Sequence, residues 1–338
     1  MAYNIALQFE DGVTRIIHCG PSELVCDAAD RAKINIPLDC REGLCGMCKC
    51  HCESGSYEMG AYSEDALAED EARKGYVLAC QLRPKSDLVI RVSASAAACN
   101  TEAGAHGGKL IKIARDSATT VTFMLQADRP LSFLPGQYVN LQVPGSKDTR
   151  SYSFSSAPNR AELSFLIRDV PNGLMSTYMR SKAVTNDRMT FAGPYGSFYL
   201  RPPIRPILML AGGTGLAPFL SMLLWLKDNP TDQPITLAYG VNTNDDLVEL
   251  AALAELKSVI TTFDYFTVVV DRESRHQRLG YVTDHLSQGQ LNDGDVDVYV
   301  CGPPPMVDGV RKWIAGVGVT PRNFYFEKFS PAHEAAAK

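Results

Sequence analysis

The chain has 338 residues, of which 45% are hydrophobic and 21% are charged, and its formal net charge is -5 at pH 7. These values are those of an ordinary soluble protein with two or three domains, each able to bury a core. Residues 1–98 contain 15 acidic and 10 basic side chains, so the first part of the chain accounts for the negative charge. That balance argues against nucleic-acid binding and suits docking to a basic patch on a protein partner.

Two features bear on where the protein resides. The first residues lack the basic and apolar regions of a signal peptide, so we expect the ten cysteines to be metal ligands or reduced thiols in the cytoplasm. The uncharged stretch 207–226 is about long enough to cross a bilayer. The stretch is interrupted by Gly212, Gly213, Gly215 and Pro218, at the point where a buried strand would turn into a helix. We therefore expect no membrane span.

The first elements are predicted from simple patterning. Residues 3–9 alternate as a strand does, Asp11-Gly12 is a strong hairpin turn, and residues 13–18 read as the returning strand. Ser22 is a suitable N-cap for a helix that follows.

A cysteine-rich loop comes next, Cys40-Arg-Glu-Gly-Leu-Cys45-Gly-Met-Cys48. Its C-x4-C-x2-C spacing wraps three thiolates round a [2Fe–2S] cluster. Cys80 lies in an apolar, strand-like run and is the predicted fourth ligand. Glycines within the loop let it curl so that backbone N–H groups face the sulfurs of a net-negative cluster.

The alternative for the Cys45-x2-Cys48 pair is a structural zinc site. Zinc ribbons and knuckles usually take their other ligands as a second close pair, whereas Cys80 stands alone downstream. Cys50 and Cys52 alternate as strand residues do, and we interpret them as packing thiols. A zinc-stapled interaction protein is therefore the alternative of a different class.

Two strands, a helix and a cysteine loop resemble the β-grasp fold of plant-type ferredoxins. The resemblance runs to about residue 95 and includes an acidic helix at 64–72. The small, polar, glycine-rich residues that follow predict a linker. We assign the ferredoxin domain to residues 1–95 and the linker to residues 96–108.

From Lys109 short strands alternate with turn residues, which predicts an antiparallel barrel over residues 109–203. Two motifs stand within it, Arg150-Ser-Tyr-Ser153 and the helix start Gly173-Leu-Met-Ser-Thr177. The predicted strands are 110–114, 121–125, 138–143, 152–155, 163–167 and 189–192.

These two motifs together resemble the flavin-binding barrel of the ferredoxin-NADP reductase superfamily. The resemblance implies that Arg150 neutralises the FAD diphosphate, Tyr152 faces the isoalloxazine, and Ser153 hydrogen-bonds flavin N5, which accepts hydride. Backbone N–H groups at the start of the 173–180 helix form an anion site for the same diphosphate. The predicted FAD-binding residues are Arg150, Ser151, Tyr152, Ser153, Ile167, Arg168, Gly173, Met175, Ser176 and Phe329.

After Pro202-Pro203 strands and helices alternate, which predicts a doubly wound parallel sheet over residues 204–338. Its first turn, Gly212-Gly-Thr-Gly-Leu-Ala-Pro218, is the strand, glycine turn and helix that cradle a pyrophosphate. Cys301-Gly-Pro-Pro-Pro-Met306 ends the last predicted strand, where ligands gather in such sheets. The predicted strands are 207–210, 235–239, 266–270 and 296–300, and the predicted helices are 216–226, 247–256, 282–286 and 306–317.

Both segments resemble the nicotinamide domain of the same superfamily. The resemblance implies that Cys301 and Glu327 border the nicotinamide and that Phe329 covers the flavin, so Ser153, Cys301 and Glu327 are the predicted catalytic residues. Asp271 follows the third strand, where a carboxylate would repel a 2′-phosphate, so NADH is predicted rather than NADPH. The predicted dinucleotide-binding residues are Gly213, Thr214, Gly215, Asp271, Cys301, Gly302 and Pro303.

The order ferredoxin, flavin barrel, nicotinamide domain resembles the reductase components of bacterial aromatic-ring-hydroxylating dioxygenases, those of the benzoate 1,2-dioxygenase type in particular. The resemblance implies that NADH gives a hydride to FAD and that electrons pass through the [2Fe–2S] cluster to a terminal oxygenase. Reductases of soluble multicomponent monooxygenases and of a deoxysugar dehydratase share this architecture and are the alternatives. The six histidines form no Ser/His/Asp pattern, so we do not expect hydrolase chemistry.

Overall fold

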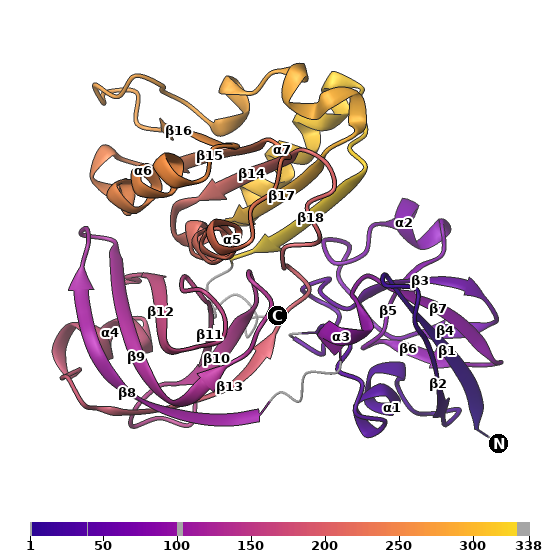
Figure 1. Ribbon diagram of the computed structural model, residues 1–338. Helices are drawn as coiled ribbons and strands as arrows, with labels where there is room; N and C mark the ends of the chain where they lie inside the picture. The colour runs from indigo at the N-terminus through magenta and orange to yellow at the C-terminus, as the bar shows by residue number, and fades with distance from the viewer. Residues whose placement is uncertain (1, 39, 100–103, 330–338) are drawn as a thin grey trace. The chain divides into compact units, whose positions relative to one another are not determined.

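The structure is a computed structural model that describes residues 2–38, 40–99 and 104–329. The chain divides into two compact units, residues 1–104 with 193–197 and residues 105–192 with 198–338 (Figure 1). Among the described residues, no helix is both long enough and apolar enough to span a membrane. The uncharged stretch near residue 207 forms a buried strand and a helix, as predicted.

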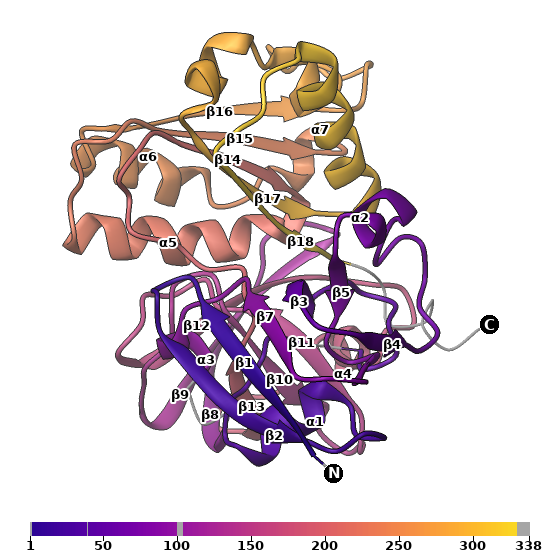
Figure 2. The same ribbon diagram turned by 90° about the vertical axis from the view of Figure 1, so that its right-hand side faces the viewer.

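The first unit is built on a five-stranded sheet with the order β2-β1-β7-β3-β5. Strand β1 pairs antiparallel with β2, placing Ile5 opposite Ile17, and parallel with β7. Figure 2 shows these three strands side by side. The strands of this unit are β1 (Tyr3–Phe9), β2 (Thr14–Cys19), β3 (Lys49–Ser54), β4 (Tyr57–Met59), β5 (Tyr76–Leu78), β6 (Leu82–Pro84) and β7 (Leu88–Val92).

The helices of this unit are short. They are α1 (Val25–Arg31), α2 (Glu69–Arg73) and α3 (Ala96–Cys99). The prediction that Ser22 caps α1 is wrong, because the helix begins after Leu24 and no side chain caps it. The Glu23 carboxylate instead accepts from the backbone N–H of Gly20 at 2.8 Å, so the chain makes a turn before the helix starts. Helix α3 lies within the predicted linker, whose residues 100–103 are outside the described residues.

The second unit begins with the predicted antiparallel barrel sheet, in the order β11-β10-β13-β8-β9-β12. Its core contains the stacked rings of Phe123 and Phe165, with centroids 5.1 Å apart, and of Phe133 and Phe154, at 3.8 Å. The elements are β8 (Gly104–Arg115), β9 (Thr120–Leu131), β10 (Tyr138–Gln142), β11 (Thr149–Ser153), β12 (Arg160–Arg168), α4 (Leu174–Ser181) and β13 (Arg188–Tyr195).

The rest of the second unit is a five-stranded parallel sheet in the order β16-β15-β14-β17-β18. Helices α5 and α6 cover one face and α7 covers the other (Figure 1). This burial on both faces explains why β14 reads as a continuous apolar run. The elements are β14 (Ile207–Gly212), η1 (Gly213–Leu216), α5 (Ala217–Asp228), β15 (Ile235–Val241), η2 (Asn244–Asp246), α6 (Leu250–Val259), β16 (Phe263–Val269), η3 (Val282–His285), η4 (Gln288–Gly294), β17 (Asp297–Gly302), α7 (Pro304–Val317) and β18 (Asn323–Lys328).

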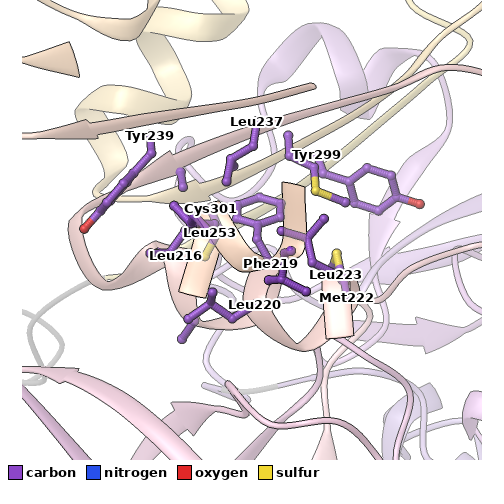
Figure 3. Close-up of a cluster of buried hydrophobic side chains, with 14 of the residues drawn as sticks. Leu216, Phe219, Leu220, Met222, Leu223, Leu237, Tyr239, Leu253, Tyr299 and Cys301 are labelled. Atoms are coloured by element: carbon purple, nitrogen blue, oxygen red, sulfur yellow. The ribbon is translucent and has the colours of Figure 1, made fainter. Parts of the chain in front are cut away.

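Two details of this sheet differ from the prediction. The helix expected at 282–286 is the short 3₁₀ turn η3. The edge strand β18 was not predicted, although it carries Glu327. Figure 3 shows part of the core beneath the sheet, where Cys301 of β17 lies among Leu216, Phe219 and Leu253.

Candidate redox site

The four predicted cluster ligands come together as two pairs. The Sγ atoms of Cys48 and Cys80 lie 3.2 Å apart, although the residues are 32 positions apart in the sequence. The β3–β5 ladder explains this approach, because Lys49 pairs with Leu78 and so places the ends of both strands together. The side chains of Cys40 and Cys45 form the second hydrogen-bonded pair.

The loop supplies backbone donors to these sulfurs, as predicted. The N–H groups of Glu42 and Leu44 lie 3.4 and 3.3 Å from the Cys40 Sγ. Gly46 has a φ of 73°, and a Cβ there would lie 2.9 Å from the Ala66 carbonyl oxygen, so the curl requires glycine. The loop can therefore compensate the charge of a bound anionic cluster.

Each pair holds one acidic thiol. The hydrogen bond from Cys45 lowers the pKa of Cys40 to about 5, and the contact with Cys48 lowers the pKa of Cys80 to about 7. The same contacts, together with burial, raise the pKa of Cys45 and Cys48. Each pair thus shares a proton that iron binding would displace, since thiolates are the ligating form.

The paired arrangement fits two irons better than one metal ion. Over residues 2–38, 40–99 and 104–329, no three His, Cys, Asp or Glu side chains converge as a site for a single ion. A [2Fe–2S] cluster takes four cysteines for two irons. The two pairs supply that number of cysteines.

Ser153 of the barrel and Glu327 of the parallel sheet meet in a buried position. Ser153 is 4% exposed and Glu327 is 6% exposed, and the Ser153 Oγ donates to the Glu327 Oε2 at 3.1 Å. The register of β17 and β18 sets Cys301 beside Glu327, with the Cys301 Sγ 3.9 Å from the same oxygen. Burial raises the pKa of Cys301 well above its usual range, so it remains a neutral thiol. The structure thus brings the three predicted catalytic residues together.

The other barrel residues of the predicted flavin set lie along β11. Tyr152 is half-buried, packs edge-on against Phe123 at 6.3 Å between centroids, and has its pKa raised by burial. Arg150 is half-buried and donates to the Thr149 carbonyl, and Ser151 donates to the Asn140 amide oxygen at 2.7 Å. Ser151 is exposed and both Arg150 and Tyr152 are partly exposed, so a ligand can reach these side chains.

In the predicted diphosphate-binding turn before α4, the serine side chain hydrogen-bonds to nearby backbone groups. The Ser176 Oγ accepts from the Val170 N–H at 2.9 Å and donates to the Arg168 carbonyl at 3.4 Å. The side chains of Ile167 and Met175 belong to the barrel core. Contacts from these residues to a cofactor would therefore come from backbone N–H and C=O groups.

The glycine turn at the end of β14 packs tightly against the end of β17. A Cβ on Gly215 would lie 2.2 Å from the Cys301 carbonyl oxygen, and one on Gly302 would lie 3.1 Å from the Gly212 Cα. Gly213, in contrast, has a φ of +56° and open space beside it, with Thr214 half-buried next in the turn. This geometry fits a dinucleotide-binding turn, because its backbone is open to a ligand at Gly213 and packs against the end of β17 at Gly215.

Two further predicted residues lie near this end of the sheet. The backbone N–H of Phe329 donates to the Gly302 carbonyl at 2.9 Å, and its ring packs partly against the core of the parallel sheet. Pro303 precedes α7 as its N-cap residue.

Asp271 lines a pocket of about 730 Å³ at the carboxyl ends of β15 and β16. Its Oδ1 accepts from the Glu273 N–H at 3.0 Å. Several residues of this pocket were missed from the sequence, although their place after the second and third strands was a usable signal. The pocket is lined by Thr243, Asn244, Asp245, Asp271, Ser274, Arg275, His276 and Gln277.

Three family models match the chain. They are a 2Fe-2S iron-sulfur cluster binding domain over residues 8–85, an oxidoreductase FAD-binding domain over residues 108–199, and an oxidoreductase NAD-binding domain over residues 209–312.

The chain also matches relatives over nearly the whole of their length. The chain is 52% identical over 335 residues to the 2-halobenzoate 1,2-dioxygenase electron transfer component of Burkholderia cepacia, covering 98% of this chain and 99% of that protein. It is 49% identical to the toluate 1,2-dioxygenase electron transfer component of Pseudomonas putida, with the same coverage. The crystal structure of an Amycolatopsis cytochrome P450 reductase matches with a TM-score of 0.73 and 30% identity, over 97% of this chain and 99% of that one.

Proposed function

The chain belongs to the family of dioxygenase electron transfer components, oxidoreductases with [2Fe–2S], FAD and NAD domains, and from this premise we propose its electron path and its client. Electrons pass from NADH through FAD and the [2Fe–2S] cluster to the terminal oxygenase of a dioxygenase for a benzoate-class acid. One observation supports this path above the others. The Ser153–Glu327 hydrogen bond joins the flavin-binding and NAD-binding domains at a buried position.

Bound FAD supplies the chemistry that converts a two-electron hydride donor into a source of single electrons. The Ser153 hydroxyl would border the reacting edge of the flavin, and because it donates its proton to Glu327, its oxygen is left to accept a hydrogen bond there. Cys301, kept neutral by burial, fills the space beside them and excludes water from the site. Tyr152 provides a flat face, and Arg150 provides a cation for the diphosphate.

The cluster ligands in this proposal are the two cysteine pairs, Cys40 with Cys45 and Cys48 with Cys80, one pair to each iron. We also propose that the ferredoxin domain ends at residue 95, the linker at residue 108 and the barrel at residue 203. The same proposal places the protein in the cytoplasm. None of the ten cysteines, all of which lie in the described part of the chain, forms a disulfide, which supports a reducing compartment.

NADH is proposed as the donor because Asp271 lines the pocket after the third strand. A carboxylate there can accept a hydrogen bond from a ribose 2′-hydroxyl and would repel a 2′-phosphate. Arg275 lines the same pocket, and its positive charge favours the 2′-phosphate of NADPH. The selectivity therefore depends on whether Asp271 or Arg275 reaches the ribose.

The client is inferred from the relatives. Two of them are named for 2-halobenzoate and toluate dioxygenases, both of which act on substituted benzoic acids. A monooxygenase client is the second candidate, because the Amycolatopsis protein is a cytochrome P450 reductase. The acidic first domain suits a basic docking surface on either client.

The decisive experiment is an anaerobic NADH titration followed by visible absorbance and low-temperature EPR. Flavin bleaching together with a reduced-cluster signal is the expected result, and bleaching without that signal would refute the cysteine assignment. Cys80→Ser should keep the bleaching and lose the signal, whereas Cys52→Ser, whose thiol lies outside the two pairs, should keep both. Turnover with a benzoate-type dioxygenase but not with a cytochrome P450 would then identify the client.

A further inference from the structure

Gln81 directly follows the proposed ligand Cys80, and its side chain fills a slot between two loops. A Cβ on Gly60 would lie 2.4 Å from the Gln81 Oε1, and one on Gly43 would lie 3.0 Å from its Cγ. The Gly60 N–H also donates to the Gln81 carbonyl at 2.8 Å. Two glycines therefore leave the space that this one side chain occupies.

The amide group of Gln81 is bound to the cluster loop. Its Nε2 donates to the carbonyl oxygen of Arg41 at 3.2 Å. Arg41 directly follows Cys40 and has a φ of 57°, a left-handed conformation that costs free energy for a residue with a side chain. The surrounding contacts must hold it there.

Arg41 is fixed from its other end by helix α1. Its Nη1 lies 3.1 Å from the Asp27 Oδ1, and its Nη2 lies 2.5 Å from the Asp30 Oδ2. Gln81 thus holds the main chain of Arg41, and the two carboxylates hold its side chain.

The Gln81–Arg41 hydrogen bond connects the loop that carries Cys40, Cys45 and Cys48 with the segment that carries Cys80. Arg41 is next to Cys40, which pairs with Cys45, and Gln81 is next to Cys80, which pairs with Cys48. The Gln81 side chain also hydrogen-bonds Cys80, whereas the donors to Cys40 described above are backbone N–H groups.

We propose that Gln81 is a positioning residue that sets the separation of the two cysteine pairs and raises the reduction potential of the [2Fe–2S] cluster they hold. An N–H donor near a ligand sulfur stabilises the reduced cluster more than the oxidised one, because reduction adds negative charge. Removing that donor therefore lowers the potential. The inference rests on the cysteine assignment proposed above.

The test is Gln81→Leu, studied in the full-length protein with both cofactors bound. A potentiometric titration followed by EPR gives the cluster potential, and absorbance gives the flavin potential in the same sample. The electron distribution between flavin and cluster should shift about threefold toward the flavin, which is about 30 mV for a one-electron couple. The flavin potential should not change. Gln81→Glu, which adds negative charge in place of a donor, should lower the cluster potential further.

Gln8→Leu is the matched control, because Gln8 is an exposed residue on β1 of the same unit. An unchanged cluster potential and EPR spectrum in iron-replete Gln81→Leu would overturn the inference. If that variant is isolated without iron, Gln81→Asn decides by the same titration, since its shorter amide cannot span to Arg41. A wild-type protein that shows no cluster signal would instead refute the proposed function itself.

Discussion

Ser153 and Glu327, 174 positions apart in the sequence, are joined by a hydrogen bond of 3.1 Å from the serine hydroxyl to the carboxylate. Ser153 ends the barrel strand β11, and Glu327 lies on the edge strand β18 of the parallel sheet. A hydrogen bond between two buried groups is strengthened by the low polarity around it. It fixes the direction of the one hydroxyl that the proposed mechanism places at the flavin.

Ser153→Ala should slow flavin reduction by NADH about 10²-fold, because it removes the hydroxyl that bonds to Glu327 and fixes the geometry of the reacting site. Stopped-flow bleaching of the flavin under anaerobic conditions measures this rate. Ser155→Ala is the control, since the Ser155 hydroxyl bonds to Ser164 at 3.0 Å within the barrel. Equal rates for wild type and Ser153→Ala would exclude the proposed role of this hydroxyl.

Gly215→Ala should destabilise the nicotinamide domain by about 2–3 kcal/mol, because its Cβ would lie 2.2 Å from the Cys301 carbonyl oxygen. Gly316→Ala is the matched change in helix α7, where a Cβ has nothing within 4 Å. It should stabilise the protein by about 0.4–1 kcal/mol. Thermal unfolding followed by circular dichroism separates the two, and the same sign for both would contradict the packing argument.

Asp271→Asn should reduce the preference for NADH over NADPH about tenfold, which corresponds to about 1.4 kcal/mol of lost charge repulsion. The ratio of kcat/KM for the two donors is the measurement. Glu273→Gln removes an exposed carboxylate two residues away and should leave the ratio as in the wild type. If the control changes the ratio as much as Asp271→Asn does, the effect belongs to net charge and not to Asp271.

The stability of the protein should fall in alkali through Cys19. Burial, followed by the neighbouring Glu23, raises the pKa of this thiol to about 11. The pKa of a cysteine thiol in the unfolded chain is about 9, so this contribution to stability is complete below about pH 9. It is lost as the pH rises through about 11, the pKa in the folded protein. The loss should reach about 2 kcal/mol.

Urea unfolding of wild type and Cys19→Ala at several pH values from 8 to 11 tests this contribution. The curve of unfolding free energy against pH should be shallower for the variant, whatever its absolute stability. Parallel curves for the two proteins would show that Cys19 does not titrate in this range.

Most of what could be predicted from the sequence came from the spacing of residues within short segments. The cysteine loop, the Arg150–Ser153 motif and the glycine turn are each local, and their strands and helices follow from periodicity. Strand β18 was missed because most of its residues are half-buried, which gives little of the alternation that marks a strand. Ser22 failed as a cap because Glu23 bonds back to Gly20 and delays the helix.

Features that depend on tertiary contact were harder to predict, although the place of two loops after β15 and β16 was a usable signal for the pocket beside Asp271. The pocket beside Asp271 is formed by two loops that are distant in sequence and become neighbours only when β15 and β16 pair. The contact of Gln81 with Arg41 spans 40 positions and depends on two glycines that make room for it. Neither residue type nor spacing marks such a pair in advance.

Strand β18 is the last strand of the site to be synthesised. Protein synthesis runs from the amino terminus, so the strand that carries Glu327 is made after the barrel and after the other strands of its sheet. A growing chain can therefore complete the barrel that offers Ser153 before the acid that orients this hydroxyl exists. A chain interrupted before residue 323 would therefore contain the barrel motif but lack both Glu327 and Phe329.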